Sequence, residues 1–198
     1  VNGNFPTVGA ESTDSYFAAF KIPDLFFYVI AAGVLGVVLI PVLSEHMVKN
    51  DRRGVWALSN SLMNLMALIM FGIGIIIFIF AGQLMHIVAP NLSPDQLHNA
   101  TTIMRFISFN PLFFTLAGIL TSTQQVFGRF FFFAISPIVY NLSIIASIYI
   151  FKDSLGLIGL GAGALIGAVL QFGVAAIGVL GLNFHWRPKI DFKSTDFW

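Results

Sequence analysis

The stretch that decides the fold is Gly72-Ile73-Gly74-Ile75-Ile76-Ile77-Phe78-Ile79-Phe80, which contains no polar side chain. It lies inside an apolar segment from about Val55 to Ala81, and about 20 residues are enough for a helix to cross the ~30 Å hydrocarbon core of a bilayer. The apolar residues run on continuously instead of alternating with polar ones, which excludes a strand of a membrane barrel. The segment therefore predicts a transmembrane helix.

Four further segments of the chain have the same character. They run from about Ser15 to Leu43, Ile103 to Gln124, Phe130 to Phe151 and Leu155 to Leu182. The composition agrees, since 57% of the 198 residues are hydrophobic and 10% are charged, against about 25% charged in soluble domains. The predicted fold is all-α: a polytopic bundle of five transmembrane helices within residues 1–182.

The segments between the predicted spans contain turn-forming and helix-capping residues. Residues 49–54 and 89–95 form the two longer loops, and Lys152-Asp153-Ser154 forms a short link. Ser93 is a predicted N-cap with Pro94 as the first helical residue, so we expect a short surface helix leading into the third span. The tail at 183–198 mixes aromatic and basic residues, which predicts an amphipathic segment in the membrane interface.

Lys and Arg are distributed unevenly between the two sets of loops. One set holds Lys49, Arg52, Arg53, Arg129, Arg187, Lys189 and Lys193, and the other holds only Lys152. Positively charged loops stay in the cytoplasm. The asymmetry therefore predicts that residue 1 lies outside and residue 198 lies in the cytoplasm.

This orientation implies something about the chain upstream. The chain has no initiator Met and no signal peptide, although its first residue is predicted to lie outside. A preceding helix ordinarily brings a polytopic chain to that side, so we expect at least one further span before residue 1.

The composition also excludes several kinds of function. There is no Cys, so a disulfide scaffold, an iron–sulfur cluster and a Cys-ligated zinc site are excluded. The net charge of +1 gives no field to attract nucleic acid. The four His have no metal-binding spacing and no catalytic constellation emerges, so we expect neither an enzyme nor a cofactor.

Residues 9–25, GAESTDSYFAAFKIPDL, resemble the MurJ/MviN family of lipid II flippases, within the multidrug/oligosaccharidyl-lipid/polysaccharide exporter superfamily. The resemblance continues in order along the chain. It is carried by Gly33, by residues 40–45 (IPVLSE), by Asn110-Pro111, by residues 128–130 (GRF), by Ser136-Pro137, by residues 141–143 (NLS) and by residues 188–192 (PKIDF).

The resemblance implies the first lobe of a transporter with 14 helices in two lobes around a central cavity. The five predicted spans would be helices 2 to 6, and residues 183–198 would lead to the second lobe. The implied function is to move an undecaprenyl-pyrophosphate-linked peptidoglycan precursor across the bacterial inner membrane by alternating access. The implied partners are this precursor, membrane lipids and cell-wall synthesis proteins.

The chain departs from the family pattern at three positions. Phe27 and Tyr28 stand where members often carry a basic pair, and Ala32 stands where they often carry Glu. In the family those charges are thought to line the cavity and meet the pyrophosphate. Two alternatives therefore stay open: export of another polyprenyl-linked glycan, and a membrane scaffold or regulator that does not transport.

Lys21 and Asp24 are the main candidate site residues, because ionisable side chains inside a span are costly and mark function by default. They lie three residues apart on one helical face, and Pro23 between them can kink the helix. The functional interpretation is a cavity-facing pair at the outer end of the span, which engages a headgroup or latches a gate. The structural interpretation is a Lys that reaches the interface beside a nearby acid.

Four other polar residues are weaker candidates for the pathway or its cytoplasmic gate. Asp14 matches the family motif but also suits a helix cap with Thr13. Glu45 is either a gate contact or an interfacial acid near Lys49 and Arg52. Arg129 is either a phosphate contact or a positively charged anchor in a cytoplasmic turn. Asn141 either lines the cavity or hydrogen-bonds to another helix.

Two backbone patterns predict how the helices pack. Asn110-Pro111 predicts a kink in the third span. The glycines at 156, 159, 161, 163 and 167 include two Gly-x-x-x-Gly pairs, which predict a small-residue face for close helix packing.

Overall fold

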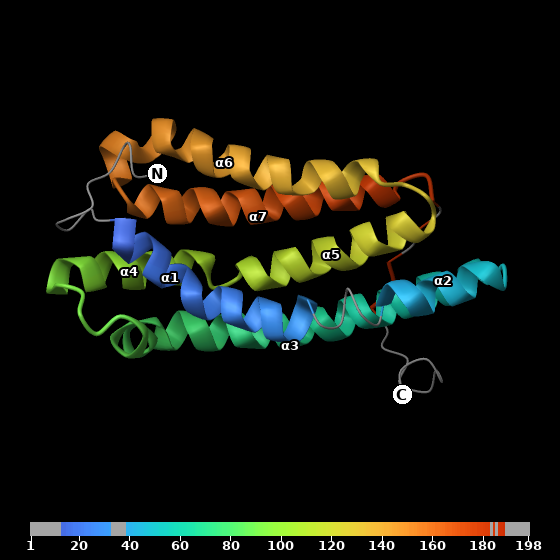
Figure 1. Cartoon of the computed structure of the whole chain (residues 1–198), viewed down its shortest axis with the longest axis horizontal. Helices are drawn as coiled ribbons and strands as arrows, with labels where there is room; N and C mark the ends of the chain where they lie inside the picture. Colours follow the sequence, from blue (N-terminus) through green and yellow to red (C-terminus); the bar gives the residue numbers. More distant parts are fainter. Residues whose placement is uncertain (1–12, 33–38, 183, 185, 189–198) are drawn as a thin grey trace.

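In the computed structural model, residues 13–32, 39–182, 184 and 186–188 are described, and all elements in these ranges are helical. The elements are α1 (Thr13–Phe26), η1 (Phe27–Ala32), α2 (Ile40–Val48), α3 (Arg52–Val88), α4 (Pro94–Ile107), α5 (Asn110–Val126), α6 (Phe131–Leu155) and α7 (Ile158–Val179). They lie roughly along one axis and form an elongated bundle (Figure 1). The prediction of an all-α bundle is confirmed.

Four helical stretches are long and apolar enough to cross a membrane: Arg52–Val88, Pro94–Val126, Phe131–Phe151 and Ile158–Val179. They correspond to the second to fifth predicted spans, and they make the chain a multi-pass membrane protein. The first predicted span corresponds to α1, η1 and α2. Residues 33–38 between them lie outside the described residues, so its continuity stays a prediction.

The bundle has a pair of helices on one side and α3 on the other (Figure 1). The helices α6 and α7 pack against each other along their lengths, α5 packs on α7 and on α3, and α4 packs on α3, α1 and α7. The segment formed by α4 and α5 is therefore the central layer of the bundle. The helix α1 lies over this layer on the same side as α3 (Figure 1).

Two clusters of buried apolar side chains follow one another along the bundle. One joins α1, α3, α4 and α7 through residues such as Ala19, Met85 and Ile103. The other joins α2, α3, α5 and α7 through residues such as Leu43, Met70 and Leu120. Many large apolar side chains on α3 and α6 are exposed instead, which suits a surface that meets lipid.

The segment after Ser93 differs from the prediction of a surface helix. The N-cap is confirmed: Ser93 accepts from the Gln96 N–H, and the Gln96 side chain accepts from the Ser93 N–H. However, Ile103, Met104 and Ile107 of α4 are fully buried in the bundle. The helix α4 is therefore the first half of the third span.

The predicted kink in the third span is confirmed. The helix α4 ends at Ile107 and α5 begins at Asn110, with Pro111 in its first turn. Pro111 has no N–H to donate to the Ile107 carbonyl, so the helical hydrogen-bond ladder cannot continue across this point.

Two other boundaries also differ from the predictions. Residues 152–154, predicted to be a link, belong to the last turns of α6, and the turn follows at Gly156, where φ is +53°. The helix α3 extends beyond the predicted segment at both ends. The α5–α6 turn is closed by the Gly128 and Arg129 N–H groups, which donate to the Gln125 and Gln124 carbonyls at 2.8 and 2.9 Å.

Candidate functional site

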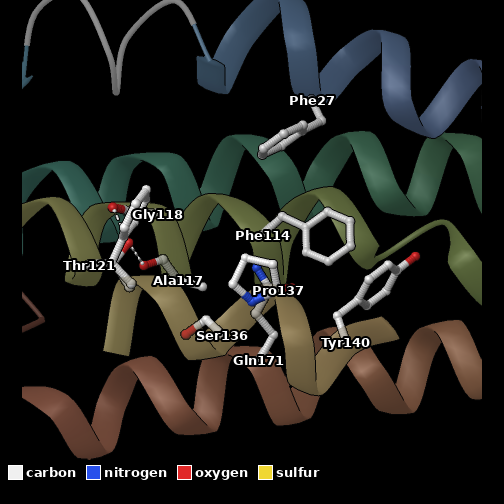
Figure 2. A pocket seen from close by; sticks show the side chains of 10 residues that line it. Phe27, Phe114, Ala117, Gly118, Thr121, Ser136, Pro137, Tyr140 and Gln171 are labelled. Atoms are coloured by element: carbon white, nitrogen blue, oxygen red, sulfur yellow. Dashed lines mark hydrogen bonds between the residues drawn. The ribbon is translucent and has the colours of Figure 1, made fainter. Parts of the chain in front are cut away.

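A pocket of about 320 Å³ opens on the side of the bundle between η1, α5, α6 and α7 (Figure 2). It is lined by Phe27, Phe114, Ala117, Gly118, Thr121, Phe133, Ser136, Pro137, Tyr140 and Gln171. The α5 residues lie at i, i+3, i+4 and i+7 from Phe114, which is one face of a helix. The pocket is therefore formed by single faces of packed helices.

Aromatic rings connect the walls of the pocket. The Phe27 ring of η1 lies edge-on to the Phe114 ring of α5, with 5.7 Å between the centroids. The Phe114 ring in turn lies edge-on to the Tyr140 ring of α6 at 5.0 Å. Edge-to-face pairs at this separation stabilise the packing beyond the area that they bury. The side of the pocket that faces η1 is therefore a row of three rings.

The polar groups of the pocket are few. The Thr121 Oγ1 donates to the Ala117 and Gly118 carbonyls at 2.9 and 3.1 Å (Figure 2). The Ser136 Oγ donates to the Phe132 carbonyl at 2.6 Å. Within the described residues, the Gln171 side chain and the Tyr140 hydroxyl make no hydrogen bond. These two groups therefore keep both donors and acceptors for a polar part of a ligand, whereas the Thr121 and Ser136 hydroxyls can still accept.

Asp24 lies on the same side of the bundle, one helical turn before Phe27. Its carboxyl group is half-buried and lies close enough to the Tyr16 and Tyr140 hydroxyls to act on both electrostatically. Tyr140 thus belongs both to the pocket wall and to the electrostatic surroundings of Asp24. We call Tyr16, Asp24 and Tyr140 the acidic cluster.

The structure places Lys21 and Asp24 differently from each other. The Lys21 side chain is exposed, whereas Asp24 is half-buried. Within the described residues, no ion pair joins the two side chains.

Pro23 lies buried inside α1, three residues before its end. Pro23 cannot donate to the Ala19 carbonyl, and the chain passes from α1 into the π-helix η1 at Phe27. π-helical segments are rare and often occur at functional sites. Here the π-helix carries Phe27, so the change of helix type lies at the pocket.

The other candidate residues lie away from the pocket lining. Asp14 is exposed in the first described turn of α1. Glu45 pairs with Lys49 at 2.6 Å on the exposed side of α2, which agrees with the interfacial interpretation. Arg129 is exposed in the α5–α6 turn.

Asn141 does not make the predicted bond to another helix. It is exposed, and its Nδ2 donates to the Pro137 carbonyl in its own helix at 2.9 Å. The bond between α6 and α7 is made by Ser143, whose Oγ donates to the Gly163 carbonyl at 3.1 Å. Asn141 is adjacent to the pocket residue Tyr140 in sequence, but it is not part of the pocket lining.

Sequence reasoning missed Phe114, Tyr140 and Gln171 as pocket residues. A signal for α5 was present, since small and polar residues follow Phe114 at helical spacing in an apolar span. Nothing comparable marked Gln171, because its role depends on how α7 packs against α5 and α6.

Membrane-spanning helices that are interrupted or change type beside a pocket are typical of transporters. Together with the four membrane-length helices, these features define a polytopic helical membrane protein. The family model described as lipid II flippase MurJ matches residues 7–197, and the chain belongs to that family.

Several proteins named probable lipid II flippase MurJ are similar to this chain. The protein of Buchnera aphidicola subsp. Schizaphis graminum is 26% identical over 186 residues, which cover 92% of this chain and 36% of the relative. That of subsp. Baizongia pistaciae is 34% identical over 139 residues, 67% of this chain and 26% of the relative. That of Rickettsia prowazekii is 28% identical over 190 residues, which cover 92% of this chain and 36% of the relative. The chain thus spans about a third of their length.

Proposed function

We propose that the protein to which this chain belongs is a transporter, not an enzyme, which flips lipid II across the bacterial inner membrane. The chain would be the part of one lobe that contributes η1, α5, α6 and α7 to the pathway. The loops rich in Lys and Arg would face the cytoplasm. Cell-wall synthesis proteins would be its partners.

The observation that supports this function best is the pocket beside the acidic cluster. A lipid-linked precursor has a long hydrocarbon chain and a polar headgroup, so its carrier needs an apolar surface next to polar groups. The aromatic row of Phe27, Phe114 and Tyr140 offers the first. The polar groups are offered by Asp24 of α1, Tyr140 of α6 and Gln171 of α7.

Reconstitution of the full-length protein in liposomes tests this function. Headgroup translocation of labelled lipid II would be measured for the wild type and for the Lys21→Ala/Asp24→Ala double variant. We expect at least a tenfold loss of rate in the double variant, because the acidic cluster loses its carboxyl group and the same helix loses the exposed ammonium group of Lys21. Glu45→Ala is the matched control, since Glu45 is exposed on α2 and pairs with Lys49. Translocation at the wild-type rate in the double variant would remove the pair from the mechanism.

A second candidate function is export of a different polyprenyl-linked glycan. The observation that favours it is Phe27, which stands at a position where the family often carries a basic residue and which lines the pocket. Competition between lipid II and other lipid-linked sugars for binding to the full-length protein separates the two. Tighter binding of another lipid-linked sugar would favour the second function.

A further inference from the structure

Three residues that follow α7 contact α3 at the end of the bundle where α3 begins: Phe184, Trp186 and Arg187. Two asparagines on α3, one helical turn apart, hold Trp186 and Arg187 there. The Arg187 N–H donates to the Asn60 Oδ1 at 3.0 Å, and the Asn64 Nδ2 donates to the Arg187 carbonyl at 2.6 Å. The Trp186 Nε1 donates to the Asn64 Oδ1 at 3.0 Å. Both backbone polar groups of Arg187 are therefore bound by side chains of α3.

The partners determine how both carboxamides are oriented. An indole N–H only donates, so the Asn64 atom that faces Trp186 is the oxygen, and the nitrogen faces the Arg187 carbonyl. The Arg187 N–H also only donates, so it faces the Asn60 oxygen. The Asn60 Nδ2 then donates to the Trp56 carbonyl at 2.9 Å. Every polar atom of the two carboxamides has a partner of the matching kind.

Aromatic rings extend this contact to the α5–α6 turn. The Phe184 ring packs on the Trp56 ring, with 5.1 Å between the centroids. The Trp56 ring stacks on the Phe127 ring at 5.0 Å, and the Arg52 guanidinium lies 5.8 Å from the Phe127 centroid. The segment after α7 is thus connected through α3 to the end of α5.

We propose that the Asn60/Asn64 face of α3 is a backbone-binding surface, and that Trp186 and Arg187 bind it as a reversible strap. The strap sets the direction in which the chain leaves the bundle after α7. It recognises the Arg187 main chain and the Trp186 indole, whereas the Arg187 side chain makes no hydrogen bond or ion pair with the part of the chain that the structure describes. It is reversible because its bonds to Asn64 are exposed, so that water competes for the same groups. This inference does not depend on which lipid the protein moves.

Hydrogen exchange of the full-length protein in nanodiscs tests the strap. The peptide that covers residues 184–188 would be followed in Asn64→Leu, Trp186→Phe and Arg187→Ala. Each lost hydrogen bond raises the exchange rate roughly two- to tenfold. Asn64→Leu removes at least the two bonds to Trp186 and Arg187, so we expect it to accelerate exchange more than Trp186→Phe, which removes one of them.

Arg187→Ala is the matched control, because it keeps both main-chain groups that α3 binds, and we expect exchange at the wild-type rate. Exchange of the α6 and α7 peptides shows whether a variant still folds, and Trp186→Phe tests the strap without altering α3. Unchanged exchange at 184–188 in both Asn64→Leu and Trp186→Phe would overturn the proposal. Equal acceleration by Arg187→Ala would also overturn it.

Discussion

At the scale of single residues, Asp24 is the acid whose surroundings distinguish it from the other candidates. It is half-buried in α1, and its charge acts on the hydroxyls of Tyr16 in α1 and Tyr140 in α6. Tyrosine hydroxyls can donate to a carboxylate or accept from a carboxylic acid.

Asp51 gives the chain a pH-dependent contact outside the membrane. Its Oδ1 accepts from the Gly54 N–H at 2.9 Å and so caps α3, and its Oδ2 lies 3.0 Å from the His46 Nδ1. The Gly54 hydrogen bond, with a smaller contribution from His46, lowers the pKa of the Asp51 carboxyl below its usual value. The carboxylate is thus favoured in the folded state.

The sign of the resulting pH dependence follows from this lowered pKa. The stabilisation by Asp51 is fully present above the unfolded-state pKa of about 3.9 and is lost as the pH falls through the folded-state value. We expect Asp51→Ala to lower the thermal unfolding temperature at pH 7. In acid, we expect the unfolding temperatures of the variant and the wild type to converge. Thermal unfolding in detergent at several pH values measures this.

Asp51→Asn is the control for this prediction, because the amide oxygen still accepts from Gly54 but carries no charge. At pH 7 we expect its thermal unfolding temperature to lie between those of the wild type and Asp51→Ala. A constant difference between Asp51→Ala and the wild type from pH 7 down to acid would contradict the account.

Single residues were predictable where their partners are local. The Ser93 cap was predicted correctly because an N-cap bonds to groups two or three residues further on. The hydrogen-bond partner of Asn141 was not predictable in this way, because an amide in a span can bond within its own helix or across to another. Only the packing of α6 on α7, where Ser143 approaches Gly163, decides which side chain makes the bond across.

At the scale of helices, the α6–α7 pair depends on glycines of α7. A Cβ atom at Gly163 would collide with the Ser147 side chain, and one at Gly167 would lie 3.0 Å from both the Tyr140 carbonyl oxygen and the Tyr140 ring. We expect Gly163→Ala to destabilise the protein by about 1–3 kcal/mol, a typical cost of overpacking. Thermal unfolding in detergent measures the effect.

Gly173→Ala is the matched control on the same helix, because a Cβ atom there meets nothing within 4 Å. Alanine is the better helix former, so this variant is expected to be stabilised by about 0.5–1 kcal/mol. We thus predict that the free energy of unfolding falls in Gly163→Ala and rises in Gly173→Ala. Destabilisation of the same size at both would show that helix packing is not the cause.

The existence and type of the helices were predictable, whereas their ends were less so. Continuous apolar segments predict spans whatever surrounds them. The last turns of α6 contain Asp153 and Ser154, which suggest a link in sequence, but helical hydrogen bonding continues to Leu155. The burial of α4 depends on α1, α3 and α7 meeting around it, which its own amphipathic sequence does not reveal.

At the scale of the whole molecule, the bundle separates its loops into two groups. The α2–α3 and α5–α6 turns lie at one end, and the α3–α4 and α6–α7 connections lie at the other (Figure 1). The first end carries Lys49, Arg52, Arg53 and Arg129. The helical arrangement thus agrees with the grouping on which the predicted orientation depends, and cytoplasmic placement of the basic end stays a prediction.

The pocket could be predicted only in part, because it is a property of the packed molecule. The sequence predicted Asp24 as a candidate site residue, and it showed that the nearby Phe27 departs from the family pattern. It did not reveal that α5, α6 and α7 complete a pocket there, since that requires residues far apart along the chain to meet.

The most direct test of this account is photocrosslinking of the full-length protein to labelled lipid II. A photoreactive amino acid would replace Phe27 or Tyr140 in the pocket, and Ile76, an exposed residue of α3 on the lipid-facing surface, as the control. The account predicts that lipid II is captured at both pocket positions and competed away by unlabelled lipid II, with little capture at position 76. Capture at position 76 equal to that at Phe27 and Tyr140, or no capture in the pocket, would contradict it.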